Sequence, residues 1–326
     1  MNYLVYVAHG ADWFCDEAAY SMLSFWRRHG ESLAAVLVAT DRPEYFARLL
    51  GADAPVRYVR LDAPRLAAWR GADGYVHRIK PLALAHAAAQ AGAGAGDAVL
   101  FADSDTVFDG DVAPVFAAIA RDEGVWLHAR EGTIASGRRL TRSQAKLHRA
   151  ARRHDFMVDG APWRLPPELP LWNSGLIGVR GDRLADLARA TVAAIDAIRP
   201  RLAIPTVEQI ALSAVLARRG TPIHALERSV FHYYNFKEFR DDLARFFAAL
   251  DGRSRADKQA RLDAIAPALR GAPKAAFMAQ PKWWRQVRKH LGRNRRGWTP
   301  LPFPDLDAPG AAGAPSAPAG ERPPRP

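Results

Sequence analysis

The chain has 326 residues, a net charge of +12 and a single cysteine, Cys15. This length suffices for one large domain or two modest ones, and one cysteine excludes both an internal disulfide and a cysteine-based metal site. No apolar run approaches the roughly 20 residues that a membrane-spanning helix needs, and the N-terminal residues lack the features of a secretion signal. We therefore expect a cytoplasmic location.

The positive charge is concentrated in two segments. Residues 138–154 and residues 282–296 each carry seven Lys or Arg and no acidic residue, which leaves a net charge of −2 for the rest of the chain. A coat of positive charge over the whole protein, of the kind that binds nucleic acid, is therefore not needed to explain the composition.

Strand patterns alternate with helical patterns from the N-terminus onward. Proline in the first turn marks the start of two helices, at Pro43 and Pro81. Such alternation is typical of a three-layer α/β fold, and apolar runs without polar alternation indicate parallel strands covered on both faces. We predict strands at 3–9, 34–41, 56–61, 98–103 and 171–181, a short strand or loop at 229–237, and helices at 16–30, 43–50, 81–91, 182–199, 206–219, 238–250 and 256–270.

Four aspartates follow the apolar run 98–102, at positions 103, 105, 109 and 111. Close carboxylates repel one another unless a cation or solvent offsets their charge. Ligands of parallel sheets bind beyond the carboxyl ends of the strands, which is where Asp103 and Asp105 fall. We assign Asp109 and Asp111 to the following turn and helix N-terminus. The sequence thus indicates a cation site at Asp103 and Asp105, the alternative being that Asp103 caps a turn and Asp105 is solvated.

Three chemistries use two aspartates one residue apart. A calcium-binding EF-hand loop is excluded, because its fifth and twelfth positions would be Val107 and Pro114, which offer no side-chain oxygen. A phosphatase of the haloacid-dehalogenase type uses Asp-x-Asp-x-Thr, but Thr106 stands one residue too early for it. The third chemistry is sugar transfer from a nucleoside diphosphate, in which a cation held by carboxylates neutralises the diphosphate leaving group. Mg²⁺ and Mn²⁺ suit such a site.

The sequence resembles the GT-A-fold glycosyltransferases, particularly the glycogenin and bacterial lipopolysaccharide galactosyl- and glucosyltransferase group. The resemblance rests on the order and spacing of four segments between residues 2 and 237: "HRIKPLAL", "VLFADSDTVFDGDVAPVF", "LWNSGLIGVR" and "TVEQIALSAVL". It implies a GT-A-type three-layer α/β/α sandwich with a mixed, mainly parallel central sheet and a C-terminal helical extension. It also implies a metal-dependent hexosyltransferase with a nucleoside-diphosphate sugar, expected to be a UDP-sugar, as donor and retention of anomeric configuration.

The resemblance assigns roles to individual residues. Metal ligands would be Asp103, Asp105 and His232, binding Mn²⁺ or Mg²⁺. Contacts to the nucleotide sugar would come from Arg78, Lys80, Asp103, Ser104, Ser174, Gly175 and Lys237, and catalytic contacts to the sugar or acceptor from Asn173, Glu208 and Gln209. The family's last motif has a glycine three residues after the histidine and a lysine six residues after it; here these positions are Asn235 and Glu238, and Lys237 stands one residue early.

We divide the chain into a catalytic domain (1–237), a helical extension with a basic amphipathic segment (238–300) and a disordered Pro/Ala/Gly-rich tail (301–326). In residues 281–298 an apolar stripe with Trp283 and Trp284 lies among basic residues. This pattern is typical of an interfacial membrane anchor and equally of a helix packed on its own domain. We expect an anionic membrane surface as a partner of this segment, at the inner face of the membrane, and a saccharide or lipid-linked saccharide as acceptor.

Two other functions compete with sugar transfer. One is the dehalogenase-type phosphatase, with Asp103 as nucleophile and Asp105 as acid. The other is a basic nucleic-acid-binding protein that uses the arginine-rich segments and tryptophans; no known nucleic-acid-binding module is apparent, so we expect no nucleic-acid partner.

Overall fold

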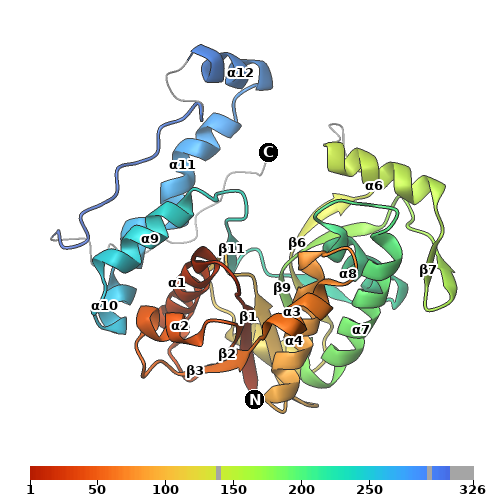
Figure 1. Ribbon diagram of the computed structural model, residues 1–326, viewed down its shortest axis with the longest axis horizontal. Coiled ribbons are helices and arrows are strands. Elements are labelled where there is room, and N and C mark those ends of the chain that lie inside the picture. Colours follow the sequence, from red (N-terminus) through yellow and green to blue (C-terminus); the bar gives the residue numbers. More distant parts are fainter. Residues whose placement is uncertain (137–140, 292–295, 309–326) are drawn as a thin grey trace.

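The computed structural model describes residues 1–136, 141–291 and 296–308. The strands are β1 (Asn2–Val7), β2 (Ala35–Thr40), β3 (Val56–Arg60), β4 (Ala98–Ala102), β5 (Thr106–Phe108), β6 (Val125–Thr133), β7 (Phe156–Val158), β8 (Ala161–Trp163), β9 (Pro170–Arg180), β10 (Ile223–Ala225) and β11 (Val230–His232). Seven of them form a central sheet in the order β10-β6-β9-β4-β1-β2-β3 (Figure 1). The pairs β11–β5 and β7–β8 form two small separate sheets.

Helices surround this sheet (Figure 1). The helices of the described residues are α1 (Asp12–His29), α2 (Pro43–Leu50), α3 (Ala63–Arg70), α4 (Ile79–Gln90), α5 (Ala113–Ala120), α6 (Arg142–Arg153), α7 (Gly181–Ile198), α8 (Val207–Arg218), α9 (Phe239–Ala249), α10 (Arg255–Ala260), α11 (Pro267–Met278) and α12 (Lys282–Leu291), with 3₁₀ turns η1 (Val76–Arg78) and η2 (Leu262–Ile265). Helices α11 and α12 extend away from the sheet (Figure 1). Among the helices of the described ranges, none is long and apolar enough to cross a membrane.

The central sheet is mixed and mainly parallel, as predicted. Strand β1 pairs in parallel with β2 and β4, and β2 with β3, while β6 and β10 form a second parallel pair. Strand β9 runs antiparallel to both of its neighbours, β4 and β6. Because β9 joins the two parallel groups, its residues lie directly beside the end of β4.

Side chains of the sheet alternate between two apolar clusters, one on each face. Leu4 and Tyr6 of β1 belong to the cluster that also holds side chains of α1, α2, α5 and α9. Tyr3 and Val5, one residue out of phase, belong to the cluster with α3, α4, α7 and α8. Both faces of the sheet are therefore covered, which confirms the predicted three-layer α/β/α arrangement and explains the uninterrupted apolar character of β4.

The C-terminal helices contribute to the same core as the sheet. Phe239 and Phe246 of α9 are fully buried in the cluster of Leu4 and Tyr6. The single helix predicted at 256–270 is wrong: this stretch is divided into α10, η2 and the first turn of α11. The division has a local cause, because Ala266 precedes Pro267 and has an extended conformation (φ −48°, ψ 127°), which ends the preceding turn.

The first part of the segment predicted to be disordered is packed against these helices. Leu306 is buried, and the guanidinium of Arg270 donates hydrogen bonds to the carbonyl oxygens of Leu301 (2.8 Å) and Pro302 (2.6 Å). The same guanidinium forms a buried ion pair with Asp242 of α9. Residues 301–308 are thus held in place, and the remainder of the predicted tail, 309–326, lies outside the described residues.

A buried carboxyl on α1 gives a prediction about stability. Burial raises the pKa of Asp16 to about 6, although the hydrogen bond from the Tyr45 hydroxyl (3.0 Å) and the nearby Arg48 oppose this rise. Because the folded pKa is raised, the folded protein binds this proton more tightly than the unfolded chain, so stability falls as pH rises from about 4 to about 6. We expect Asp16→Asn to increase the free energy of unfolding by about 1–2 kcal/mol at pH 7. Denaturant titrations at pH 7 and pH 4 test this, since the gain must vanish at pH 4.

Candidate metal centre

Strand pairing brings residues that are far apart in the sequence to the end of β4. The backbone N–H of Asp103 donates to the carbonyl oxygen of Gly175 (2.7 Å), which continues the β4–β9 pairing past the last residue of β4. Strand β11 pairs antiparallel with β5, so that His232 stands opposite Thr106, and the N–H of Tyr233 donates to the carbonyl oxygen of Asp105 (3.0 Å). His232 is thereby fixed beside the two aspartates.

Asp103, Asp105 and His232 form a group that could hold a metal ion, with one ligand atom of each lying within 4.8 Å of the others. His232 Nε2 is 3.0 Å from Asp105 Oδ1 and 4.0 Å from Asp103 Oδ2. Asp105 and His232 are buried, and Asp103 is partly exposed, so a ligand could reach the group from the side of Asp103. Two carboxylates and one imidazole are a donor set that suits a divalent cation such as Mn²⁺.

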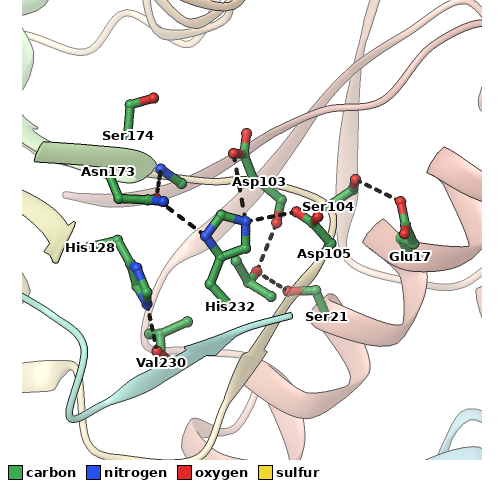
Figure 2. A network of polar contacts seen from close by, with 12 residues as sticks. Glu17, Ser21, Asp103, Ser104, Asp105, His128, Asn173, Ser174, Val230 and His232 are labelled. Atoms are coloured by element: carbon green, nitrogen blue, oxygen red, sulfur yellow. Dashed lines mark hydrogen bonds and ion pairs between the residues drawn. The ribbon is translucent and has the colours of Figure 1, made fainter. Parts of the chain in front are cut away.

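The ring of His232 is oriented by Asn173 (Figure 2). Asn173 Oδ1 accepts a hydrogen bond from the N–H of Gly175 (2.8 Å), and its Nδ2 donates to Glu131 (2.8 Å), which fixes the orientation of the amide. His232 Nδ1 lies 3.2 Å from that same Oδ1 and must therefore carry a proton to donate. Nε2 then faces the carboxylates either with a second proton or with its lone pair free for a cation, which is the usual arrangement of a histidine metal ligand.

Two lysines offset the negative charge of the aspartates, Lys237 at Asp105 and Lys80 at Asp103. Lys237 Nζ lies 2.6 Å from Asp105 Oδ2. Although burial opposes ionisation of Asp105, the hydrogen bond and charge of His232 together with the Lys237 ammonium keep its pKa well below the usual range. The carboxylate is thus held in the charged form that binds a metal. Lys237 reaches the group despite standing one residue early in the motif; Glu238, the next residue, pairs instead with Lys274 (2.7 Å).

Lys80, at the N-terminus of α4, connects Asp103 to a second buried carboxyl. Its Nζ lies 3.0 Å from Asp103 Oδ1 and 3.8 Å from Glu208 Oε2. Burial opposes the charge on Lys80, but Asp103 and Glu208 together raise its pKa. Burial raises the pKa of Glu208, while Lys80 and the hydroxyl of Ser174 (2.8 Å) oppose the rise. Lys80, Ser174 and Glu208 therefore lie together beside the metal-binding group.

Position 175 must be glycine because the ring of His232 lies directly against its backbone. A Cβ at this position would lie 2.4 Å from the ring atoms Cε1 and Nδ1 of His232 and 2.9 Å from Asn173 Oδ1. No side chain fits there without moving the histidine. The predicted contact of Gly175 with a donor sugar stays a prediction. The structure gives the residue another role, because the absence of a side chain at position 175 leaves space for the ring of His232.

Two of the predicted site residues face other partners, and a third lies partly buried on α8. Arg78 forms a two-pronged ion pair with Asp196 of α7 (2.7 and 2.8 Å). The hydroxyl of Ser104 turns toward α1 and donates to Glu17 (3.3 Å; Figure 2). Gln209 follows Glu208 on α8 and is partly buried. Their predicted contacts with the nucleotide, sugar or acceptor stay predictions.

Sequence reasoning missed a buried carboxylate that supports the site from α1. Glu17 is fully buried, accepts from Ser104, and forms an ion pair with Arg240 of α9 (2.9 Å). Burial raises its pKa, and the hydrogen bond from Arg240 opposes the rise. The available signal was the pair of acidic residues at positions 16 and 17 beside the apolar residues of this helix, since buried carboxylates need partners.

No family model matches the chain, and the search of curated proteins found no match to it.

Proposed function

We propose that the protein is a metal-dependent glycosyltransferase that transfers a hexose from a nucleoside-diphosphate sugar, expected to be a UDP-sugar, to a saccharide or lipid-linked saccharide. The observation that carries the proposal is the meeting of Asp103, Asp105 and His232 beyond the carboxyl end of β4. This is the place where α/β sheets bind ligands. The resemblance to GT-A-fold enzymes supports the same conclusion, because its predicted metal ligands are these three residues.

A divalent cation bound by these residues would supply Lewis-acid stabilisation of the diphosphate leaving group. Lys237 is half exposed, so its ammonium can contact a phosphate oxygen while remaining near Asp105. Lys80 holds Asp103 in place through hydrogen bonds and charge. Asn173 fixes the proton of His232 on Nδ1, so we assign it a positioning role in addition to the predicted contact with substrate. Glu208 and Gln209 remain the proposed contacts to the sugar or acceptor.

The test is an assay of nucleotide-sugar hydrolysis with the full chain and a panel of UDP- and GDP-hexoses. We expect slow release of the nucleoside diphosphate in Mn²⁺, none after removal of the metal by a chelator, and recovery on adding Mn²⁺ back. Thermal shifts with each donor, with and without Mn²⁺, identify the donor, because a ligand that binds only the folded state raises the melting temperature. Absence of hydrolysis and of a Mn²⁺-dependent thermal shift across the panel would refute the proposal.

The phosphatase alternative conflicts with the surroundings of Asp105. An aspartate that acts as a general acid needs a raised pKa so that it holds a proton near neutral pH. The neighbours of Asp105 have the opposite effect, because His232 and Lys237 lower its pKa despite burial. Thr106, the nearest match to the threonine of that motif, is fully buried in β5, and its hydroxyl donates to the carbonyl oxygen of Asp103 (2.8 Å).

We further propose that helix α12 contacts an anionic membrane surface. Trp283 and Trp284 are exposed by 66% and 42%, so neither belongs to the core, whereas Trp298 of the same predicted segment is buried. Four side chains of α12 are Lys or Arg and none is acidic. Exposed indoles beside positive charges suit a layer of anionic headgroups.

Substitution tests this better than truncation, because truncation before α12 would also remove the buried Trp298 and Leu306. We expect the double variant Trp283→Ser, Trp284→Ser to bind phosphatidylglycerol vesicles about tenfold more weakly than the unchanged chain at low salt. Phosphatidylcholine vesicles are the control, and added salt should weaken binding to the anionic vesicles. Equal vesicle binding by the two proteins in a flotation assay would contradict the proposal.

A further inference from the structure

A second cluster of cationic side chains surrounds a cavity away from the metal-binding group. The cavity has a volume of about 290 Å³ and lies between α6 and the chain that joins α7 to α8. It is lined by Lys146, Arg149, Ala150, Arg153, His154, Arg201, Leu202 and Ala203. The basic residues come from two separate segments, since Arg201 lies about fifty positions after α6, and only the fold brings them together.

The cavity has no carboxylate in its lining. Nearby arginines outside it are paired, such as Arg164 with Asp155 (2.7 Å) and Arg199 with Asp73 (2.7 Å). In the described part of the chain, no ion pair is found for Lys146, Arg149 or Arg201. Positive charges gathered around one space repel each other unless an anion lies between them. The lining therefore favours a ligand of high negative charge.

The size of the cavity limits that ligand. A volume of about 290 Å³ is at the lower end of the range for small-molecule sites, about 300–1,000 Å³. It suits a phosphate or diphosphate group better than a whole nucleotide sugar. Arginine guanidinium groups bind phosphate oxygens through paired hydrogen bonds, and several arginines at one site are typical of phosphate recognition.

The cavity is joined to the metal-binding group through α8. The chain at 201–203 leads into this helix, whose second residue is Glu208, the neighbour of Lys80. The backbone N–H of Glu208, in the first turn of α8, donates a hydrogen bond to the Tyr75 hydroxyl (3.0 Å), which in turn donates to the carbonyl oxygen of Pro205 (2.5 Å). The connecting chain is thus anchored between the two sites.

We propose that this cavity binds the phosphate or diphosphate group of the acceptor. The identification of the ligand as the acceptor rests on the proposed glycosyltransferase function, whereas the binding of a phosphate group does not. In Figure 1 helices α6 and α12 both lie in the upper part of the view, on the side away from the N-terminus, with a wide separation between them. An acceptor whose phosphate is held at α6 would therefore lie on the side of the molecule that we propose faces the anionic membrane surface.

The experiment is titration calorimetry of the full chain with inorganic pyrophosphate in metal-free buffer, in which the aspartate group has no cation to recruit the anion. The test variant is Arg149→Gln, Arg201→Gln, which removes one guanidinium from each segment. The control is Arg152→Gln, on the same exposed helix but outside the cavity lining. We expect affinity to fall about tenfold or more in the test variant and less than twofold in the control.

Three results would overturn the proposal: no binding of pyrophosphate by the unchanged chain, an equal loss in the control variant, or an unchanged affinity in the test variant. Flotation with phosphatidylglycerol vesicles separates a free phosphate ligand from a lipid headgroup. Weakened binding of both pyrophosphate and vesicles identifies a lipid-borne phosphate, and weakened binding of pyrophosphate alone identifies a soluble one. Loss of vesicle binding alone is a case of the third result, because the affinity of the test variant for pyrophosphate is then unchanged. Donor hydrolysis, measured separately, should be unchanged in both variants and reports only on the proposed function.

Discussion

Replacing Asp105 by asparagine is expected to reduce Mn²⁺-dependent hydrolysis of the donor by about a thousandfold or more, because stabilisation of a leaving group by a bound cation is worth several kcal/mol. The substitution keeps the shape of the side chain but removes the charge that His232 and Lys237 contact at 3.0 and 2.6 Å. Lys237 is half exposed and can remain solvated, so the fold should persist. Release of the nucleoside diphosphate at increasing Mn²⁺ concentrations measures the effect.

Asp111→Asn is the matched control for this substitution. Asp111 belongs to the same acidic stretch, and its carboxylate accepts a hydrogen bond from the N–H of Ala113 at the start of α5 (2.9 Å), which an asparagine oxygen can also accept. We expect metal dependence like that of the unchanged chain and little loss of stability. Activity of the Asp105 variant within about tenfold of this control would show that Asp105 does not hold the cation.

The strand and helix pattern could be predicted because each element carries its own local signal. Helix α2 begins at Pro43 as predicted, since proline at the first helical position has a suitable φ angle and lacks only an N–H that would be unpaired there. Strand β4 was predicted from five consecutive apolar residues, all of which are buried. The division of 256–270 also has a local signal in the sequence, because Pro267 disfavours a helical conformation at the preceding residue, Ala266.

The partners of the site residues could not be predicted in the same way, because they depend on packing between distant elements. Glu17 and Arg240 are 223 positions apart and meet only because α9 packs on α1. The direction of β9 is likewise a property of the whole sheet: its antiparallel pairing with β4 places Gly175 beside Asp103. The aspartate pair was visible from spacing alone, whereas His232 was assigned only through the resemblance to known enzymes.

Replacing His232 by alanine should raise the Mn²⁺ concentration needed for half-maximal activity by about tenfold to a hundredfold. Substituting a residue that only orients a metal ligand already weakens metal binding by about this factor. A second consequence concerns pH. A histidine ligand must be neutral at the nitrogen that faces the metal, so metal affinity of the unchanged chain should weaken on acidification, and this dependence should diminish in the variant. Titrations of activity against Mn²⁺ at several pH values measure both effects.

The control for His232 is His128, a buried histidine of β6 whose ring contacts that of His232 edge to face at 5.1 Å. His128 lies outside the group of possible metal ligands. Substituting either histidine removes a buried imidazole and should lower the melting temperature to a similar extent, but only His232→Ala should shift the Mn²⁺ titration. If His128→Ala shifts that titration equally, or if His232→Ala leaves it unchanged, then the role of His232 is to pack against its neighbours, and the metal would depend on the two aspartates alone.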